Sequence, residues 1–417
     1  MRVLWICNSL FPSICEKLGE KVPISGSWLY SLADKLAQCA DIELAILIPY
    51  KTKKIIKIEN GGIVFFLIPY IGDLTRYNQK NNLVCAQVRD IYQPDIVHIH
   101  GTEFACGLSY IRACGSRNIV VSIQGLVGII ERYYYAGMLM GDIIKNLTLR
   151  SIIFRDSIID QRRSFFLRGR LEKEYFECAH NFIGRTEWDK THAFTYNECI
   201  NYFHCDELLR DSFYSGKWDI EKCNKYSIFL SQGNYPLKGL HQLLKALSIV
   251  KKTHPDVRLY IGGKNIIGRE SLYEKLAFSN YGKYIFQLIK KNDLVDNVIF
   301  LGFLNEEEMK KCYLKSHVFV VPSSIENSPN SLAEAQILGL PLIAANVGGI
   351  PSMVKDGTSG YLYRFEEYET LAVLILRIFK GYDKSISMNS INVAKKRHDP
   401  AKIIADMLSI YKRIIIK

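Results

Sequence analysis

Short apolar runs alternate with helix-length amphipathic segments along almost the whole chain. The run Val3–Cys7, for example, is followed by Trp28–Cys39, in which apolar residues recur at helical spacing. This alternation is typical of mainly parallel sheets covered by helices, so we predict an α/β fold. Further strands are expected in the first half at Ile42–Ile48, Val64–Ile68, Ile96–Ile99, Val120–Ile123 and Phe182–Ile183, with a helix at Asn81–Tyr92.

The second half repeats this design without repeating the sequence, and a polar, irregular stretch at 204–224 separates the two. Because 417 residues exceed one ordinary core, we predict two Rossmann-like domains, 1–205 and 206–395, and a C-terminal helix within 396–417 that packs back on the first domain. The second-half strands are expected at Ser227–Ser231, Arg258–Ile261, Val298–Phe300, Val318–Val321 and Pro341–Ala344, and its helices at Gly239–Lys252, Glu306–Lys315 and Ser331–Leu338.

The formal net charge of +12 favours anionic partners, namely nucleic acid, an anionic membrane or phosphorylated substrates. The opening run Met1–Cys7 is shorter than a secretory signal, and we expect no membrane-spanning helix, which predicts a cytoplasmic protein. Between Lys145 and Lys173, arginines alternate with apolar residues. That segment either lies on the inner face of an anionic membrane or is an ordinary helix with a solvated or phosphate-facing basic side.

The segment that follows Val321 carries the most specific signal. A strand ends there, a loop contains Glu326, and a helix is predicted to begin near Asn330 or Ser331. The first amides of a helix lack helical partners and favour negative charge, so this end can hold a diphosphate. A capping box between Ser331 and Glu334 would explain Glu334 without a ligand, but it would not explain Glu326.

The sequence around these two glutamates resembles that of family 4 of the GT-B glycosyltransferases, which are retaining enzymes. Glu326 and Glu334 are separated by seven residues, and the motifs at 339–344, 348–351 and 354–362 continue the match. The resemblance is strong over about 227–362 and looser before that. It implies two Rossmann-like domains whose mainly parallel sheets face a central cleft, and a nucleotide diphosphate sugar as donor.

The resemblance also implies a role for each residue of this segment. Glu326 would lie against the donor sugar, and Glu334 would hold the ribose hydroxyls. Carboxylates suit both tasks, because a sugar diol offers two donors to two acceptor oxygens. The amides near Asn330, Ser331 and Leu332 would meet the diphosphate.

A second segment, Ser231–Gly239, resembles the phosphate-binding loop of the same family. Lys238 would neutralise charge on the leaving diphosphate. Gly233 occupies the place of the family's arginine, which leaves open which cation joins Lys238. Gly262 and Gly302 stand where the family packs its backbone close to the nucleotide, although tight turns would equally explain them.

The N-terminal half offers weaker matches. Gly26 resembles the family's loop that approaches the donor phosphates, and His100 ends a predicted strand as the family's cleft histidine does. We assign His100 to the donor or acceptor sugar, and Glu103 to the acceptor. Gln124 and Arg185 lie in stretches that resemble enzymes of bacterial surface polysaccharides; we expect both to contact the acceptor, and Arg185 is a candidate for the missing cation.

The sequence therefore predicts a retaining glycosyltransferase that needs no metal or other cofactor, with Glu326, His100 and Lys238 as its catalytic residues. A UDP- or GDP-linked sugar would pass to a glycan or a polyprenyl-diphosphate-linked acceptor in capsule or O-antigen (lipopolysaccharide) synthesis. Cys199, His204 and Cys205 lack a fourth ligand for zinc. The alternatives are a nucleotide-sugar epimerase on the same scaffold, and a non-enzymatic protein that binds an anionic membrane or nucleic acid; no nucleic-acid-binding motif is present.

Overall fold

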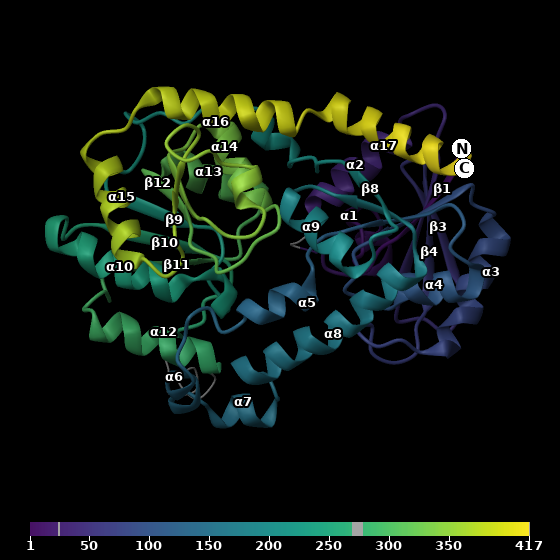
Figure 1. The fold of residues 1–417 in the computed structure, drawn as a ribbon, viewed down its shortest axis with the longest axis horizontal. Helices are drawn as coiled ribbons and strands as arrows, with labels where there is room; N and C mark the ends of the chain where they lie inside the picture. Colours follow the sequence, from purple (N-terminus) through teal and green to yellow (C-terminus); the bar gives the residue numbers. More distant parts are fainter. Residues whose placement is uncertain (24–25, 269–277, 417) are drawn as a thin grey trace. The chain divides into compact units, whose positions relative to one another are not determined.

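A computed structural model describes residues 1–23, 26–268 and 278–416 (Figure 1). The chain divides into two compact units, with one boundary at Arg210/Asp211 rather than at the expected 205/206. Residues 130–164 also differ from the expectation, because they cluster with the second unit although segments of the first unit flank them. Unit 1 comprises Met1–Ile129, Phe165–Arg210 and His398–Lys417, and unit 2 comprises Ile130–Ser164 and Asp211–Arg397.

Unit 1 contains an eight-stranded sheet in the order β3-β4-β2-β1-β5-β6-β7-β8. All neighbouring pairs are parallel except the edge hairpin of β3 and β4. The strands are β1 (Arg2–Ile6), β2 (Glu43–Tyr50), β3 (Ile56–Asn60), β4 (Ile63–Pro69), β5 (Ile96–His100), β6 (Ile119–Ser122), β7 (Asn181–Gly184) and β8 (Asn201–His204).

Helices cover both faces of this sheet. On β1, Val3 and Trp5 belong to one buried cluster and Leu4 and Ile6 to the other, as expected for a strand buried on both sides. The first cluster includes α1 (Pro12–Leu18), α2 (Ser27–Ala37) and α17 (Pro400–Ile416), and the second includes α3 (Asn82–Tyr92), α4 (Cys106–Cys114), α8 (Ile158–Cys178) and α9 (Glu187–Tyr196).

A buried polar network fixes the C-terminal helix α17 to this sheet. Trp5 Nε1 donates to the Tyr411 hydroxyl at 3.0 Å, and that hydroxyl lies 2.7 Å from Nδ1 of His98. His98 Nε2 lies 2.7 Å from Ser122 Oγ. Because the indole can only donate, the consistent arrangement has Tyr411 donating to Nδ1 and Nε2–H donating to Ser122. The C-terminal helix thus packs on unit 1 through a chain of hydrogen bonds in which each donor has an acceptor.

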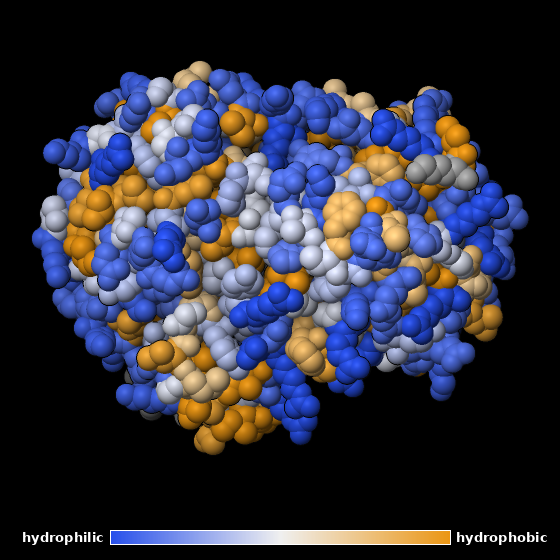
Figure 2. Space-filling view, viewed as in Figure 1, coloured by the Kyte–Doolittle hydropathy of each residue, from blue (hydrophilic) through white to orange (hydrophobic). Residues whose placement is uncertain are grey.

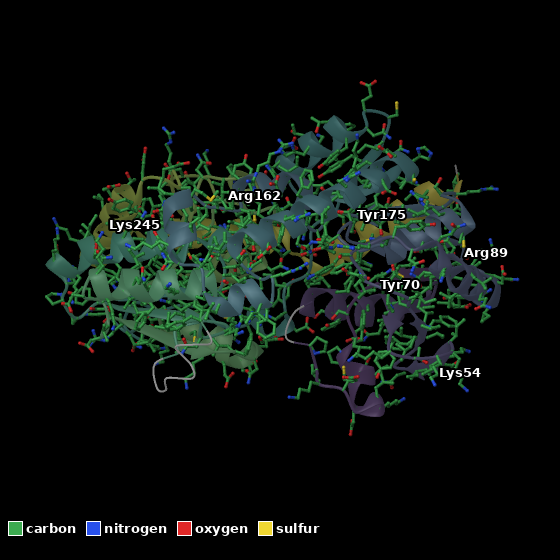
Figure 3. All side chains as sticks on the ribbon, turned by 90° about the horizontal axis from the view of Figure 1, so that it is seen from below. Lys54, Tyr70, Arg89, Arg162, Tyr175 and Lys245 are labelled. Carbon is green, nitrogen blue, oxygen red and sulfur yellow. The ribbon has the colours of Figure 1, made fainter. Side chains whose placement is uncertain are left out.

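Tyr175 of α8 supports the segment that follows β5. Its hydroxyl donates to the carbonyl of Phe104 and accepts the backbone N–H of Leu108 at 2.9 Å. Figure 3 labels this residue among the side chains of the same unit. The contact holds the start of α4, and with it the loop that contains Glu103.

Unit 2 contains a six-stranded, fully parallel sheet in the order β11-β10-β9-β12-β13-β14. Its strands are β9 (Ser227–Leu230), β10 (Arg258–Gly262), β11 (Val298–Gly302), β12 (Val318–Val321), β13 (Leu342–Ala345) and β14 (Tyr361–Tyr363). Its helices include α6 (Met140–Lys145), α7 (Leu149–Ile153), α10 (Leu240–Thr253), α12 (Asn280–Lys291), α13 (Glu306–Lys315), α14 (Asn330–Leu338), α15 (Tyr368–Lys380) and α16 (Lys384–Arg397).

The strand order reverses once within each doubly wound sheet. In unit 1 the chain builds outward from β1 in one direction and returns through β5 on the other side; in unit 2 the same happens at β9 and β12. The loops that leave two such strands diverge to opposite faces, so a crevice opens at their carboxyl ends where ligands commonly bind. This topology directs attention to the loops after β5, β9 and β12.

Gly239 allows two of these loops to approach each other. It has a φ of +68°, and an added Cβ would lie only 1.6 Å from the carbonyl oxygen of Pro322, just after β12. Gly357 has nearly the same φ, +66°, but nothing lies within 4 Å of its would-be Cβ. The pair separates the cost of backbone conformation from the cost of close packing.

We predict that Gly239→Ala destabilises unit 2 by more than about 3 kcal/mol, whereas Gly357→Ala costs about 1 kcal/mol. Both substitutions pay for the left-handed conformation, but only the first forces the Pro322 backbone to move. Hydrogen exchange of peptides from β9 and β12 measures the difference. Equal losses in the two variants would contradict the close contact.

Candidate functional site

Lys238 and Glu326 form an ion pair at the reversal point of the unit 2 sheet. Lys238 follows β9, Glu326 follows β12, and Nζ lies 2.6 Å from Oε1. Ser323 Oγ donates to the same oxygen at 2.7 Å. Burial alone would lower the pKa of Lys238, but Glu326 and Tyr235 outweigh it and raise that pKa above its ordinary value. The lysine is therefore a fixed positive charge, and the carboxylate is held in one orientation.

Backbone contacts position the Glu326 loop. Gly349 N–H donates to the Glu326 carbonyl at 2.9 Å. An added Cβ on Gly348 would lie 2.0 Å from that same oxygen, so the two glycines of this motif allow the close approach. On the other side, Ser324 N–H donates to the Leu237 carbonyl at 2.8 Å, which joins the loop after β12 to the one after β9.

Helix α14 begins at Asn330, four residues after Glu326. Pro329 is its N-cap residue, and no side chain caps the helix. The capping box considered for Ser331 and Glu334 does not form. Glu334 is instead 4% exposed, and its Oε2 accepts the Tyr313 hydroxyl at 3.3 Å. Capping therefore no longer accounts for this carboxylate, and the helix end keeps its positive polarity.

The three amides expected to meet a diphosphate do not all share the same surroundings. Leu332 N–H donates to the Pro329 carbonyl at 3.0 Å within the first turn. Asn330 and Ser331 precede it in the same turn. Ser331 contributes its carbonyl to the Tyr313 hydroxyl at 3.0 Å, so Tyr313 fixes the first turn as well as Glu334.

Close packing accounts for Gly233 and Gly262, and a positive φ accounts for Gly302. An added Cβ on Gly233 would lie 3.1–3.2 Å from the side chains of Leu240, Ile261 and Leu230, so a side chain there would enter apolar packing. On Gly262 it would lie 2.7 Å from the Ser231 carbonyl oxygen, and Gly302 has a φ of +78° next to a register shift. These contacts agree with the tight-turn alternative.

A cavity of about 450 Å³ lies beside the Lys238 loop in unit 2. The loop after β9 contributes Asn234 and Tyr235, and the loop after β10 contributes Lys264. Arg150 also lines it and pairs with Asp156 at 2.7 Å. Sequence reasoning missed Lys264, although a lysine directly after Gly262-Gly263 at a strand end was a usable signal.

In unit 1, His100 ends β5 at the other reversal point and is 7% exposed. Among the described residues neither ring nitrogen has a hydrogen-bond partner. Its ring lies 4.4 Å from that of Trp5 and 3.9 Å from that of His98 (centroid distances). Burial, together with His98, holds the pKa of His100 well below its usual value. The imidazole is thus neutral, with one donor and one acceptor nitrogen available to a polar ligand.

The residues expected to contact the acceptor gather next to His100. An added Cβ on Gly101 would meet Glu103 Oε2 at 2.3 Å and Gln124 Cγ at 3.6 Å, so these two side chains flank Gly101. Burial raises the pKa of Glu103, against the opposing effect of nearby arginines. A cavity of about 20 Å³, lined in part by His100 and Gln124, is far smaller than a sugar ring.

The first turn of α2 reaches the same region. The ring of Trp28 lies 6.0 Å from that of His100. Gly26 is the N-cap residue of α2, with a φ of +91°, and an added Cβ would meet the Tyr30 hydroxyl at 3.2 Å. Of the expected donor-binding residues, Gly26 is the one that belongs to unit 1.

Arg185 does not offer the free cation considered above. It is 5% exposed, and its guanidinium forms an ion pair with the buried carboxylate of Glu207. The same group donates to the carbonyls of Ile123 and Gln124 at 3.1 and 2.7 Å. Its charge is therefore balanced within unit 1, and its hydrogen bonds fix the backbone just after β6.

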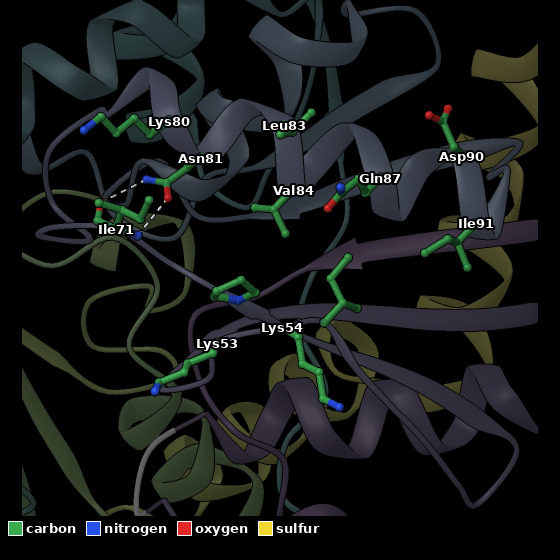
Figure 4. A pocket seen from close by; sticks show the side chains of 12 residues that line it. Lys53, Lys54, Ile71, Lys80, Asn81, Leu83, Val84, Gln87, Asp90 and Ile91 are labelled. Carbon is green, nitrogen blue, oxygen red and sulfur yellow. Dashed lines mark hydrogen bonds between the residues drawn. The ribbon is translucent and has the colours of Figure 1, made fainter.

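Two other features take no part in this arrangement. Cys205 is buried in the unit 1 core and Cys199 is exposed, while His204 contacts Asp206 at 3.0 Å; among the described residues no His, Cys, Asp and Glu group suits a metal. A cavity of about 700 Å³ lies beside α3 with Lys53, Lys54 and Lys80 on its walls (Figure 4), but no expected site residue lines it.

Comparison with known proteins identifies relatives of unit 2. Residues 213–397 match the family described as Glycosyl transferases group 1. This match covers less than half of the chain. The amylovoran biosynthesis glycosyltransferase AmsK of Erwinia amylovora is 29% identical over 39% of this chain, and spore coat protein SA of Bacillus subtilis is 28% identical over 42%. The matched residues thus lie within the unit that holds Lys238 and Glu326.

These matches span 43% and 46% of the two relatives, less than half of each. Solved structures extend the likeness to the whole chain. Sucrose-phosphate synthase from Thermosynechococcus elongatus has a TM-score of 0.70 at 16% identity, covering 100% of this chain and 99% of that one. Anabaena Alr3699/HepE, solved with UDP and glucose, has a TM-score of 0.64 at 17% identity, with 98% and 99% covered. The predicted GT-B fold is confirmed.

The buried network around His98 gives a pH prediction. Burial lowers the pKa of His98 to about 3. Above its ordinary value of about 6.5 both states are neutral, but as the pH falls only the unfolded chain takes up the proton, and stability is lost. Going from about pH 7.5 to about pH 5.5, the stability advantage of wild type over His98→Phe should shrink by about 1 kcal/mol.

Hydrogen exchange of β5 peptides in both proteins measures this difference within unit 1, since the two units need not unfold together. A constant difference across the pH range would mean that His98 has the same pKa in the folded and the unfolded chain, and would contradict its burial as a neutral imidazole.

Proposed function

We propose that this chain is a glycosyltransferase that binds a nucleotide diphosphate sugar with its group 1 domain and an acceptor with unit 1. The observation that carries the proposal is the Lys238–Glu326 pair at the sheet reversal point, with Glu326 four residues before the start of α14. A positive side chain, a helix amino end and a fixed carboxylate supply the complement of a diphosphate joined to a sugar.

Lys238 and the amino end of α14 would stabilise the charge that develops on the departing diphosphate. In other enzymes a divalent cation stabilises the charge on a departing diphosphate. Because Lys238 and α14 would do so here, we propose that transfer needs no metal. Lys264, at the cavity beside Lys238, would supply the second cation that Gly233 cannot. Glu334, oriented by Tyr313, would accept the ribose hydroxyls.

We further propose transfer with retention of anomeric configuration. Glu326 Oε1 already accepts from Lys238 and Ser323, which makes this carboxylate a poor nucleophile and a good anchor for sugar hydroxyls. The bond between the anomeric carbon and the phosphate oxygen would break while the acceptor oxygen bonds on the same face. The acceptor proton would pass to the departing phosphate.

On the unit 1 side, neutral His100 would hydrogen-bond a sugar hydroxyl, and Glu103 and Gln124 would contact the acceptor. The name of the relative AmsK, amylovoran biosynthesis glycosyltransferase, supports a role in bacterial surface polysaccharide synthesis. The acceptor would then be a glycan or a polyprenyl-diphosphate-linked oligosaccharide of capsule or O-antigen assembly, with the protein peripheral to the anionic inner face of the membrane.

We predict that Lys238→Met lowers kcat for transfer by about 10²–10³-fold, because it removes one preorganised charge from the leaving group. Lys251 lies on α10, the helix that follows Lys238, and its side chain pairs with Asp293; Lys251→Met serves as the control and should keep near wild-type activity. Product formation from UDP- and GDP-sugars with polyprenyl-diphosphate acceptors is followed by mass spectrometry, with circular dichroism to verify the fold. Full activity of Lys238→Met would refute the site.

Chelation tests the proposed metal independence. Transfer should be unchanged after EDTA treatment, because Lys238 and α14 carry the positive charge. Loss of activity on chelation and its return with a divalent cation would overturn this part of the proposal.

A reaction without acceptor separates transfer from the epimerase alternative. We expect nucleotide sugars to stay intact or to hydrolyse slowly when no acceptor is present. Interconversion of one nucleotide sugar into its epimer would favour the other enzyme class.

A further inference from the structure

The short helix α7 is amphipathic, but its apolar face points to solvent and a polar residue to the protein interior. Leu149, Ile152 and Ile153 share one face at spacing i, i+3 and i+4, and that face is exposed, whereas polar Ser151 is fully buried. A helix of a soluble domain normally turns such an apolar stripe toward the core. The inverted orientation calls for an apolar partner outside the domain.

The exposed apolar surface extends beyond α7. Leu139, Ile144 and Phe154 join the three α7 residues, and all six side chains are 54–78% exposed. Figure 2 shows a continuous hydrophobic patch over α6 and α7, with hydrophilic atoms around it. Scattered apolar residues are ordinary on a protein surface, but a contiguous patch marks an interaction site.

The patch stands on a well-fixed frame. Asn280 Nδ2 donates to the Ile143 carbonyl at 3.0 Å, and Thr148 Oγ1 donates to the Phe278 carbonyl at 2.9 Å. Thr148 and Ser151 also form a capping box at the start of α7. Buried polar contacts therefore hold the backbone so that the apolar side chains face outward.

Basic residues accompany the apolar ones. Lys145 precedes α7 and Arg155 follows it, and both are exposed. Arg150 is paired with Asp156, and Asp142 is only partly exposed, so the exposed charges in this segment are positive. An apolar face with a cationic rim matches an anionic lipid surface, where acyl chains and headgroups offer both complements.

We propose that α6, α7 and Phe154 form a docking surface that inserts into the interface of an anionic bilayer. This docking surface would place the chain at a membrane that presents a lipid-linked acceptor. Its biological purpose rests on the proposed function, whereas membrane binding itself does not. No described helix is long and apolar enough to cross a membrane.

The test is flotation of the full-length chain with phosphatidylcholine vesicles, with or without phosphatidylglycerol. We expect binding to the anionic vesicles that weakens as salt is added. The triple variant Ile152→Ser, Ile153→Ser, Phe154→Ser should lose at least about tenfold in bound fraction. The matched control, Val295→Ser, Phe303→Ser, Val373→Ser, removes comparably exposed apolar side chains elsewhere in unit 2 and should float like wild type.

A second variant tests the rim. Lys145→Glu with Arg155→Glu should abolish the preference for phosphatidylglycerol while leaving the fold intact. Equal flotation of the Ile152 triple variant and wild type, or no binding of wild type to anionic vesicles, would overturn the proposal. So would a dimer in sedimentation analysis that the triple variant disrupts without any vesicle binding, because the patch would then seat a second copy.

Transfer to a water-soluble acceptor keeps the two proposals apart. The triple variant should transfer sugar as wild type does in that assay. Vesicle binding without any transfer by wild type would refute the proposed function alone, and transfer without vesicle binding would refute the docking surface alone.

Discussion

The unit 2 site depends on one ion pair held where two loops almost touch. Lys238 and Glu326 leave adjacent parallel strands, and their side chains can meet only because Gly239 lets the backbone after β9 approach Pro322. Gly348 allows the matching approach behind Glu326. The glycines of the group 1 motif thus set the distance between the charges, and the charges fix each other's orientation. A pair already formed costs little reorganisation when an anionic ligand arrives.

Unit 1 offers polar groups of a different kind at its own reversal point. The buried pairs there are internally balanced, as with Arg185 and Glu207, or neutral, as with His98 and its hydroxyl partners. His100 is the exception among the site residues, because its two nitrogens are buried without partners in the described structure. A neutral imidazole suits the hydroxyl groups of a sugar, whereas the charged pair of unit 2 suits a diphosphate.

Prediction from the sequence succeeded where a local sequence motif determines where a strand ends. The motif spacing was enough to anticipate that Lys238 and Glu326 follow two strands, and a doubly wound sheet brings such ends together. It failed where tertiary contacts decide. The start of α14 at Asn330 agrees with the prediction, but the contacts of Tyr313, from a neighbouring helix, with Ser331 and Glu334 were not anticipated. Likewise, Arg185 is neutralised by a glutamate distant in sequence.

Residues 130–164 could not be assigned to unit 2 from the sequence, since they lie between segments of unit 1. Their hydrogen bonds explain the placement: His241 Nε2 lies 2.8 Å from the Ala136 carbonyl, and Ser324 Oγ donates to the Tyr133 carbonyl at 3.2 Å. Ser324 belongs to the loop that carries Glu326. The segment that exposes the apolar face of α7 therefore also supports the loop that carries Glu326, through the hydrogen bond between Ser324 and Tyr133.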